Sequence, residues 1–131
     1  VSGTIKNLVV ASDAEMTTSA NDYSVTGKIV ADGTRYTSFN GQVLCDVTSK
    51  RIVKCSQQAT DLILTQSDVT TVDDYAFSQC TNLVSLVLPE TIETAGTNSF
   101  AGCTGLKNDS NLFDGSYYVG TASNPKMFQI S

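Results

Sequence analysis

Apolar residues recur at a fixed spacing in the centre of the chain. Phe77, Cys80 and Leu83 return 23 positions later as Phe100, Cys103 and Leu106. A period of this size is typical of a solenoid, in which each unit buries its apolar face against the next unit. The pattern therefore predicts about two 23-residue repeats, with matching side chains stacked in one core.

Each repeat is expected to begin with a strand in which leucines alternate with other residues, Leu62 and Leu64 in the first repeat and Leu86 and Leu88 in the second. A short segment should follow, with Val69 and Val72 in the first repeat and Ile92 and Ala95 in the second. A single helical turn should then bring Phe, Cys and Leu inward at three-residue spacing. The first repeat has one extra residue after Leu64, which leaves the strand register near Thr65 open.

Other β elements are expected on both sides of the repeats. Residues 41–56 alternate around the polar turn Thr48-Ser49, and residues 115–131 contain a second candidate hairpin. Residues 1–40 lack the repeat but hold two β-branched segments, 4–10 and 23–30. We therefore expect a mainly β solenoid with short helical turns. An N-terminal β cap over 1–40 and a repeat segment over 41–131 should together form one compact domain.

Length and charge restrict the classes of partner. The 131 residues fit one domain with a modest core. Eight basic residues against thirteen acidic ones give a net charge of −5, so neither nucleic acid nor an anionic membrane surface is an expected partner. No apolar run approaches the roughly 20 residues of a membrane span, so no membrane insertion is expected. Abundant Ser and Thr, 32 of 131 residues, suit β-rich extracellular material.

The repeats resemble a known family. The second one reads Leu88-Pro89-x-x-Ile92-x-x-Ala95-Gly96-x-x-x-Phe100-x-x-Cys103-x-x-Leu106, which is similar to the BspA-like leucine-rich repeat LPxxVxxIGxxAFxxCxxL. The first matches again in Ala76-Phe77-x-x-Cys80-x-x-Leu83. The segments 41–55 and 115–125 are similar to a hairpin insert and an inter-repeat segment of the same family. The resemblance covers roughly residues 40–131, and residues 1–40 match no family.

The resemblance implies a secreted or cell-surface protein used in adhesion and protein–protein contact, with no cofactor and no family catalytic site. Its partner would be a host protein, a cell-surface protein or a second copy. Members of the family usually have many repeats, whereas two are clear here. An open solenoid end could therefore be closed by a neighbouring copy, which makes a structural subunit of a self-associating extracellular filament or coat the alternative function.

The outward face of the repeat strands is the expected partner-binding surface. If the repeat leucines point inward, the residues that point outward are Asp61, Ile63, Thr65, Ser85 and Val87. Ile63 and Val87 would then lie side by side, and exposed apolar neighbours on a flat sheet favour contact with another protein. The alternative is that a neighbouring loop or hairpin covers them.

Four cysteines without a CxxC motif, in a chain without histidine, make a zinc site improbable. Cys80 and Cys103 would stack in register and point the same way, so we expect buried free thiols. Cys45 and Cys55 share a face of their hairpin if its loop has three residues, and lie on opposite faces if it has two. A disulfide between them is therefore one of two alternatives, and an oxidising compartment would permit it.

The remaining polar motifs are weaker. Asn108-Asp109-Ser110 is an N-glycosylation sequon, which either carries a glycan on a eukaryotic surface protein or is accidental. Asp73-Asp74 and the scattered Asp109 and Asp114 lack the dense oxygen ligands of a calcium site and are expected to be solvated turn residues.

Catalytic chemistry has few of the residues that it requires. Without histidine, the Ser-His and Cys-His devices are unavailable, although a carboxylate pair stays open. The tyrosines Tyr75, Tyr117 and Tyr118 either anchor a partner, since tyrosine is enriched at binding hot spots, or pack at the edge of the core, which is the commoner role. We expect a protein without enzymatic activity.

Overall fold

The computed structural model describes residues 3–11, 23–31, 33, 35–64, 68–106, 117–124 and 127–130. These residues form strands and turns, with no helix among them. The strands are β1 Gly3–Ile5, β2 Leu8–Val10, β3 Tyr23–Val25, β4 Ile29–Ala31, β5 Tyr36–Phe39, β6 Val43–Asp46, β7 Arg51–Cys55, β8 Asp61–Ile63, β9 Thr71–Val72, β10 Ser85–Leu88, β11 Thr94–Ala95, β12 Tyr117–Thr121 and β13 Phe128–Ile130.

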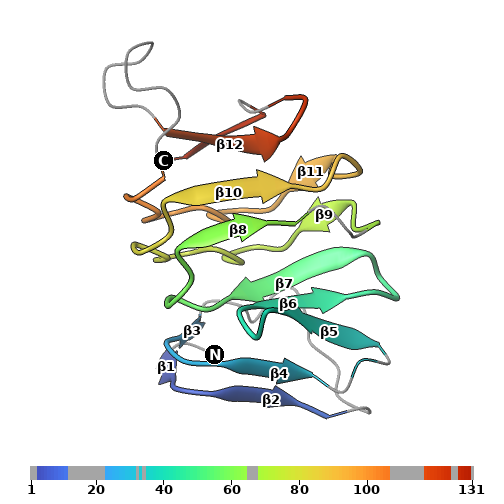
Figure 1. Ribbon diagram of the computed structural model, residues 1–131, viewed down its shortest axis with the longest axis vertical. Coiled ribbons are helices and arrows are strands. Elements are labelled where there is room, and N and C mark those ends of the chain that lie inside the picture. The colour runs from blue at the N-terminus through green and yellow to red at the C-terminus, as the bar shows by residue number, and fades with distance from the viewer. Residues whose placement is uncertain are drawn as a thin grey trace.

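The strands are stacked along the long axis of the molecule, from β2 at one end to β12 at the other (Figure 1). One sheet has the order β13-β12-β10-β8 and another the order β11-β9-β7-β6-β5. Pairing of β8 with β10 and of β9 with β11 is parallel, as successive coils of a solenoid require. The result is a β-solenoid of about three turns, which agrees with the predicted leucine-rich-repeat architecture.

The register explains the extra residue of the first repeat. Leu62 pairs with Leu86, an offset of 24, whereas Thr71 pairs with Thr94, an offset of 23. The additional residue therefore belongs to the part of the chain between β8 and β9, and the strand pairing on either side of it stays in register.

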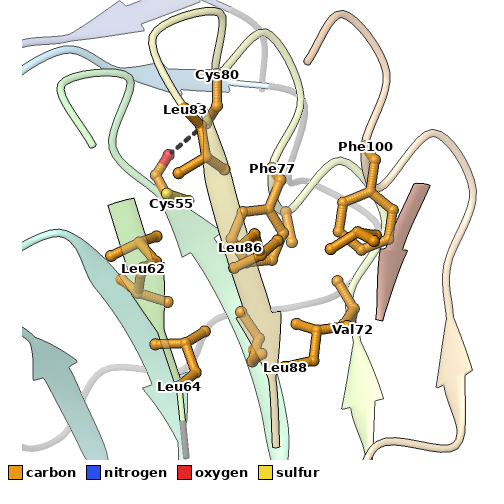
Figure 2. Close-up of a cluster of buried hydrophobic side chains, with 14 of the residues drawn as sticks. Cys55, Leu62, Leu64, Val72, Phe77, Cys80, Leu83, Leu86, Leu88 and Phe100 are labelled. Carbon is orange, nitrogen blue, oxygen red and sulfur yellow. Dashed lines mark hydrogen bonds between the residues drawn. The ribbon is translucent and has the colours of Figure 1, made fainter. Parts of the chain in front are cut away.

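The core is a ladder of matching side chains. Phe77 and Phe100 are stacked with their ring centroids 5.4 Å apart (Figure 2). Phe128 of β13 continues the stack, with its centroid 6.1 Å from that of Phe100. Leu83 and Leu106 are buried in the same core. The predicted stacking of one repeat on the next is confirmed, because rings of successive coils lie in contact.

The predicted helical turns are wrong. Between β9 and β10 the chain makes successive β-turns, in which Ala76, Ser78 and Cys80 donate to the carbonyls three residues earlier. The intervening N–H groups, of Tyr75, Phe77 and Gln79, donate instead to carbonyls of the next coil. A helix would use every N–H within its own segment, so these bonds between coils are incompatible with one.

These turns require left-handed backbone at repeated positions. Tyr75 and Gln79 have φ of 59° and 62°, and their counterparts 23 residues on, Asn98 and Gly102, have φ of 51° and 79°. Such angles strain a residue with a Cβ, and only glycine adopts them freely. Exposed Gln79 is therefore strained where the second repeat has glycine.

Gln79→Gly is expected to raise the free energy of unfolding by about 0.5–1 kcal/mol, because relief of left-handed strain exceeds the entropic cost of a glycine. Urea-induced unfolding would measure the change. The matched variant Gly102→Ala should lower stability, because an added Cβ would lie 2.6 Å from the Gln79 side chain and at a positive φ. Equal effects of both substitutions would contradict the assignment.

The N-terminal segment forms coils of its own. Each of the two expected strands is split by a bend, so that β1 pairs with β3 and β2 with β4, both in parallel. At the bend, the Lys28 N–H donates to the Asn7 side chain at 2.9 Å. The offsets are 20 for Gly3 with Tyr23 and 21 for Leu8 with Ile29, a shorter period than that of the repeats.

The hairpin β6–β7 lies between two cores, and both of its strands are buried throughout. Val43 and Ile52 face the core of the repeats, whereas Leu44 and Val53 face the core of the N-terminal coils. A shift of register between Leu44 and Cys45 accommodates the extra residue of β7. The hairpin is therefore a shared wall.

Candidate functional site

The outward side chains of β8 and β10, which we call the β8–β10 face, are Asp61, Ile63, Ser85 and Val87. The register pairs Asp61 with Ser85 and Ile63 with Val87. The alternating leucines of the same strands point into the core (Figure 2). Ile63 is 58% exposed and Val87 is half-buried, so the predicted apolar pair lies on the surface as neighbours.

The next strand continues this face without adding a side chain. Val87 pairs with Gly120 of β12, so glycine is the third member of the row that begins at Ile63. Beyond β10, the Glu90 carboxylate accepts bonds from the Ser123 hydroxyl and N–H at 2.6 and 3.0 Å. These bonds lower the pKa of Glu90 and hold the turn after β12 against β10.

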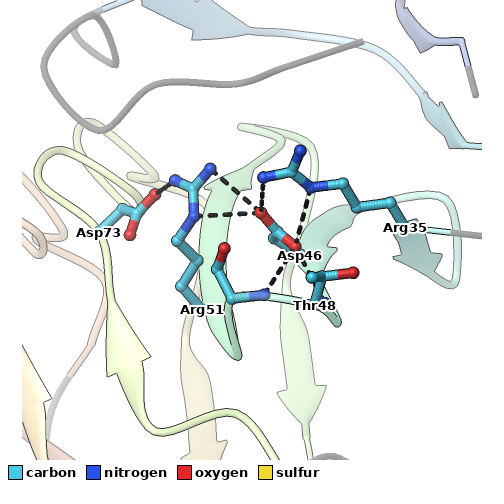
Figure 3. Close-up of polar contacts among 6 residues, drawn as sticks. Arg35, Asp46, Thr48, Arg51 and Asp73 are labelled. Atoms are coloured by element: carbon cyan, nitrogen blue, oxygen red, sulfur yellow. Dashed lines mark hydrogen bonds and ion pairs between the residues drawn. The ribbon is translucent and has the colours of Figure 1, made fainter. Parts of the chain in front are cut away.

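A buried network of charges lies in the other sheet and links the hairpin β6–β7 to the turn after β9. Asp46 accepts bonds from Arg35 and Arg51, each with a closest contact of 3.2 Å, and Arg51 also pairs with Asp73 (Figure 3). Asp46, Arg51 and Asp73 are all buried. The expectation that Asp73 is a solvated turn residue is therefore wrong. Arg51, one coil below, neutralises its charge. Asp74 agrees better than Asp73 with the expectation of a turn residue, because it is only half-buried and its carboxylate accepts a hydrogen bond from the Thr97 N–H.

The electrostatic balance of this network favours the ionised form of Asp46. Burial by itself raises the pKa of that carboxyl, but the Ser49 N–H and the two guanidinium groups outweigh it and hold the pKa below 3.8. Thr48 and Ser49 both donate their N–H groups to the same oxygen at 3.0 Å, which also fixes the β6–β7 turn. The network therefore fixes the position of the β6–β7 turn and contributes to the stability of the fold.

Lys54 extends the polar layer towards the N-terminal coils. Its ammonium donates to the Tyr75 carbonyl at 2.7 Å and lies 4.8 Å from the centroid of the Tyr23 ring. Burial, reinforced by the charge of Asp73, raises the pKa of Tyr23 to about 12, so the phenol is neutral. The alternating pattern of β7 gave no signal for this burial, because it predicts a solvated second face.

The repeat segment matches a known protein family. The model described as BspA type leucine rich repeat region (6 copies) matches residues 45–116, which is more than half of the chain. The chain belongs to this family. No curated protein and no solved structure matches it. Leucine-rich-repeat families are in general non-enzymatic modules that bind proteins, and BspA-type members are typically associated with surfaces.

The cysteine of the BspA-type repeat has a structural role in this chain. Cys103 donates its thiol to the Phe77 carbonyl at 2.9 Å, and Cys80 lies 3.7 Å from the Cys55 carbonyl, one coil below (Figure 2). Both are buried free thiols, as predicted. Burial raises the pKa of Cys103 to about 12, which suppresses the reactive thiolate.

The other cysteine pair lies on one face of the hairpin. In the strand register, Cys45 lies opposite Ile52 and Cys55 lies opposite Val43. Both thiols face the repeat core, and the cause is the bulge in β7 rather than a three-residue loop. Both are free in this structure, and burial raises the pKa of Cys45 to about 12. A Cys45–Cys55 disulfide is not formed here.

Several predicted positions lie outside the described residues, namely Thr65, Asn108, Asp109 and Asp114, together with the side chains of Tyr117 and Tyr118. The glycosylation site therefore stays a prediction. Tyr75 is half-buried beside the core. In the described part of the chain, no group of three or more metal-binding side chains gathers. No described segment forms a helix with the length and hydropathy to cross a bilayer.

Proposed function

We propose that this chain is a non-enzymatic module of an extracellular or cell-surface protein, and that it binds another protein through the β8–β10 face. The observation that carries the proposal is the pair of exposed Ile63 and half-buried Val87 on a sheet whose other side is packed into the repeat core. Family membership and the Ser- and Thr-rich composition support the location. Protease treatment of intact cells, followed by detection of the chain, would test it.

The chemistry of the face favours a protein partner. Ile63 and Val87 supply apolar area, while Asp61 and Ser85 supply polar groups beside it. An apolar centre beside polar groups is the usual composition of a protein–protein contact. Because parallel strands and a packed core hold the four side chains, little conformational entropy is lost when a partner binds.

The double variant Ile63→Lys, Val87→Glu is expected to weaken partner binding about 30-fold or more, which corresponds to about 2 kcal/mol at the centre of a contact. The probe is the labelled protein applied to an array of extracellular proteins, and the measurement is the affinity for each protein that it binds.

The chain provides a matched control. Val9 and Val30 are also register partners, 72% and 48% exposed, on the sheet formed by β2 and β4. The variant Val9→Lys, Val30→Glu makes the same charge change at a distant pair and should leave affinity unchanged. Unaltered binding by the Ile63 and Val87 variant, or equal losses in both variants, would show that another surface is used.

A further inference from the structure

The shared hairpin continues only one of the two sheets of the repeats. β7 pairs with β9, whereas β8 is the last strand of its own sheet among the described residues. At this position, a hollow with a volume of about 320 Å³ lies between the end of β8 and the hairpin. Leu64, which directly follows β8, lines it from the repeats, and Cys45 and Ile52 line it from the hairpin.

The lining of the hollow is mainly apolar. Seven of its ten lining residues have apolar side chains, so an apolar group that entered it would be removed from water favourably. Cys45, Ile52 and Leu64 are buried, whereas Phe39 is half-buried and Val47 is 37% exposed. The hollow therefore extends from the repeat core to the surface.

The hollow adjoins the β8–β10 face. Leu64 is the residue after Ile63, and Pro89, which also lines the hollow, comes two positions after Val87. At about 3.3 Å per residue of strand, both lie within about 7 Å of the apolar pair along the chain. A partner that covers Ile63 and Val87 therefore reaches the hollow with a neighbouring side chain.

The size and lining of the hollow favour an aromatic side chain of such a partner. Pockets for small-molecule ligands measure roughly 300–1,000 Å³, so this hollow lies at their lower limit. Phe39 contributes a ring to the lining, and aromatic pairs attract each other beyond the effect of burial. Tyrosine and tryptophan seated in pockets carry much of the binding energy of many protein–protein interfaces.

The charges around the hollow favour a basic residue next to this aromatic one. Asp68 is the only charged residue in the lining. In the described residues 36–64 and 68–106, Lys50 is the only exposed cation, while the exposed carboxylates belong to Asp61, Asp68, Glu90 and Glu93. Lys50 lies 3.6 Å from Asp68, but both side chains are more than half exposed, so the pair is weak and an incoming cation can replace it.

A second copy of this chain fits the hollow poorly. The large apolar side chains that are exposed on the described residues are four valines and Ile63, with no aromatic residue among them. An isologous contact would also bring the same carboxylates from both copies together, because it pairs identical patches. Like charges at such a contact oppose association.

From these observations, we infer that the hollow between β8 and the hairpin receives an aromatic side chain of the partner protein, and that a lysine or arginine beside that residue pairs with Asp68. The inference rests on the proposed binding through the β8–β10 face, which it extends past the ends of the two strands. The hollow is then the anchor point of the contact, and its charge selects basic partners.

Titration of the whole chain with capped dipeptides, followed by amide NMR shifts, tests the hollow itself. Acetyl-Trp-Arg-amide should shift the Phe39, Val47 and Val69 amides saturably and bind about threefold more tightly than acetyl-Trp-Glu-amide. Asp68→Asn should remove this preference, whereas Glu93→Gln, an exposed carboxylate outside the lining, should keep it. Absence of saturable shifts at these amides, or equal affinity for both dipeptides, would overturn the inference. Equally tight binding of indole alone would also overturn it, because the occupant would then be a small apolar molecule.

Variants applied to the array of extracellular proteins separate this inference from the proposed function. Val47→Trp places a large side chain at the opening and should weaken partner binding about tenfold or more, whereas Val30→Trp, at a distant valine that is 48% exposed, should not. If Val47→Trp leaves affinity unchanged while the Ile63 and Val87 double variant lowers it, the inference fails and the proposed function stands. The opposite result supports the hollow and removes the β8–β10 face. Shifts of the hollow amides that grow with the protein's own concentration would overturn the inference in favour of a second copy.

Discussion

Replacement of Phe77 by alanine is expected to lower the free energy of unfolding by about 3–5 kcal/mol. The side chain is fully buried and stacks on Phe100, so its removal leaves a cavity between two coils and removes one ring from the aromatic stack. Total stabilities of single domains are about 5–15 kcal/mol, so much of the folded population would be lost on mild heating. Chemical unfolding followed by circular dichroism would measure the loss.

Two control variants test whether the loss of stability comes from the stacking of successive coils. Phe77→Leu keeps most of the apolar volume and should cost clearly less, while Val84→Ala removes methyl groups at a side chain that is 54% exposed and should change stability by about 0.5 kcal/mol or less. If Phe77→Ala were as mild as Val84→Ala, stacking of successive coils would not be the source of stability.

Asp46→Ala is expected to be similarly damaging, at about 3–5 kcal/mol, because it breaks a buried ion pair and removes the acceptor of two turn N–H groups. Arg51 would keep Asp73 but lose its second carboxylate. Asp46→Asn, which retains an acceptor without the charge, should lie between wild type and Asp46→Ala. Thermal unfolding of the three proteins at pH 7 would rank them.

The same residue predicts a pH dependence. Its pKa is lower in the folded chain than the ordinary value of 3.8, so the folded state binds the proton less readily than the unfolded state. The stabilisation is therefore complete above about pH 4 to 5 and is lost as the pH falls through the folded pKa. Asp46→Ala should lose less stability than wild type over that acid range. The exposed pair of Lys50 and Asp68 offers a control, since Asp68→Ala should have a small effect at pH 7.

Much of the repeat segment was predictable from its sequence. Side chains that recur at a constant spacing and must be buried together leave few arrangements, so the Phe77–Phe100 stack and the outward pair of Ile63 and Val87 followed from periodicity alone. The extra residue after Leu64 was also visible, and the change of offset between the two sheets places it.

The turns and the charge network were not predictable in the same way. The inward spacing of Phe77, Cys80 and Leu83 fits a helical turn as well as a run of β-turns, and only bonds to the next coil distinguish them. Asp73 follows a short strand, as solvated residues often do, and its partner Arg51 lies 22 residues away. No local pattern links two such positions, because the pairing depends on which coil lies underneath.

The shared hairpin determines where the chain can be divided. A fragment that begins at residue 41 would keep the repeats, but it would expose Leu44 and Val53 to water and leave the Lys54 ammonium without the Tyr23 ring. A fragment that ends at residue 40 would lose the wall against which Val25 and Ile29 pack. Truncation for expression or grafting would therefore succeed best when both sets of coils are retained, although their sequence periods differ.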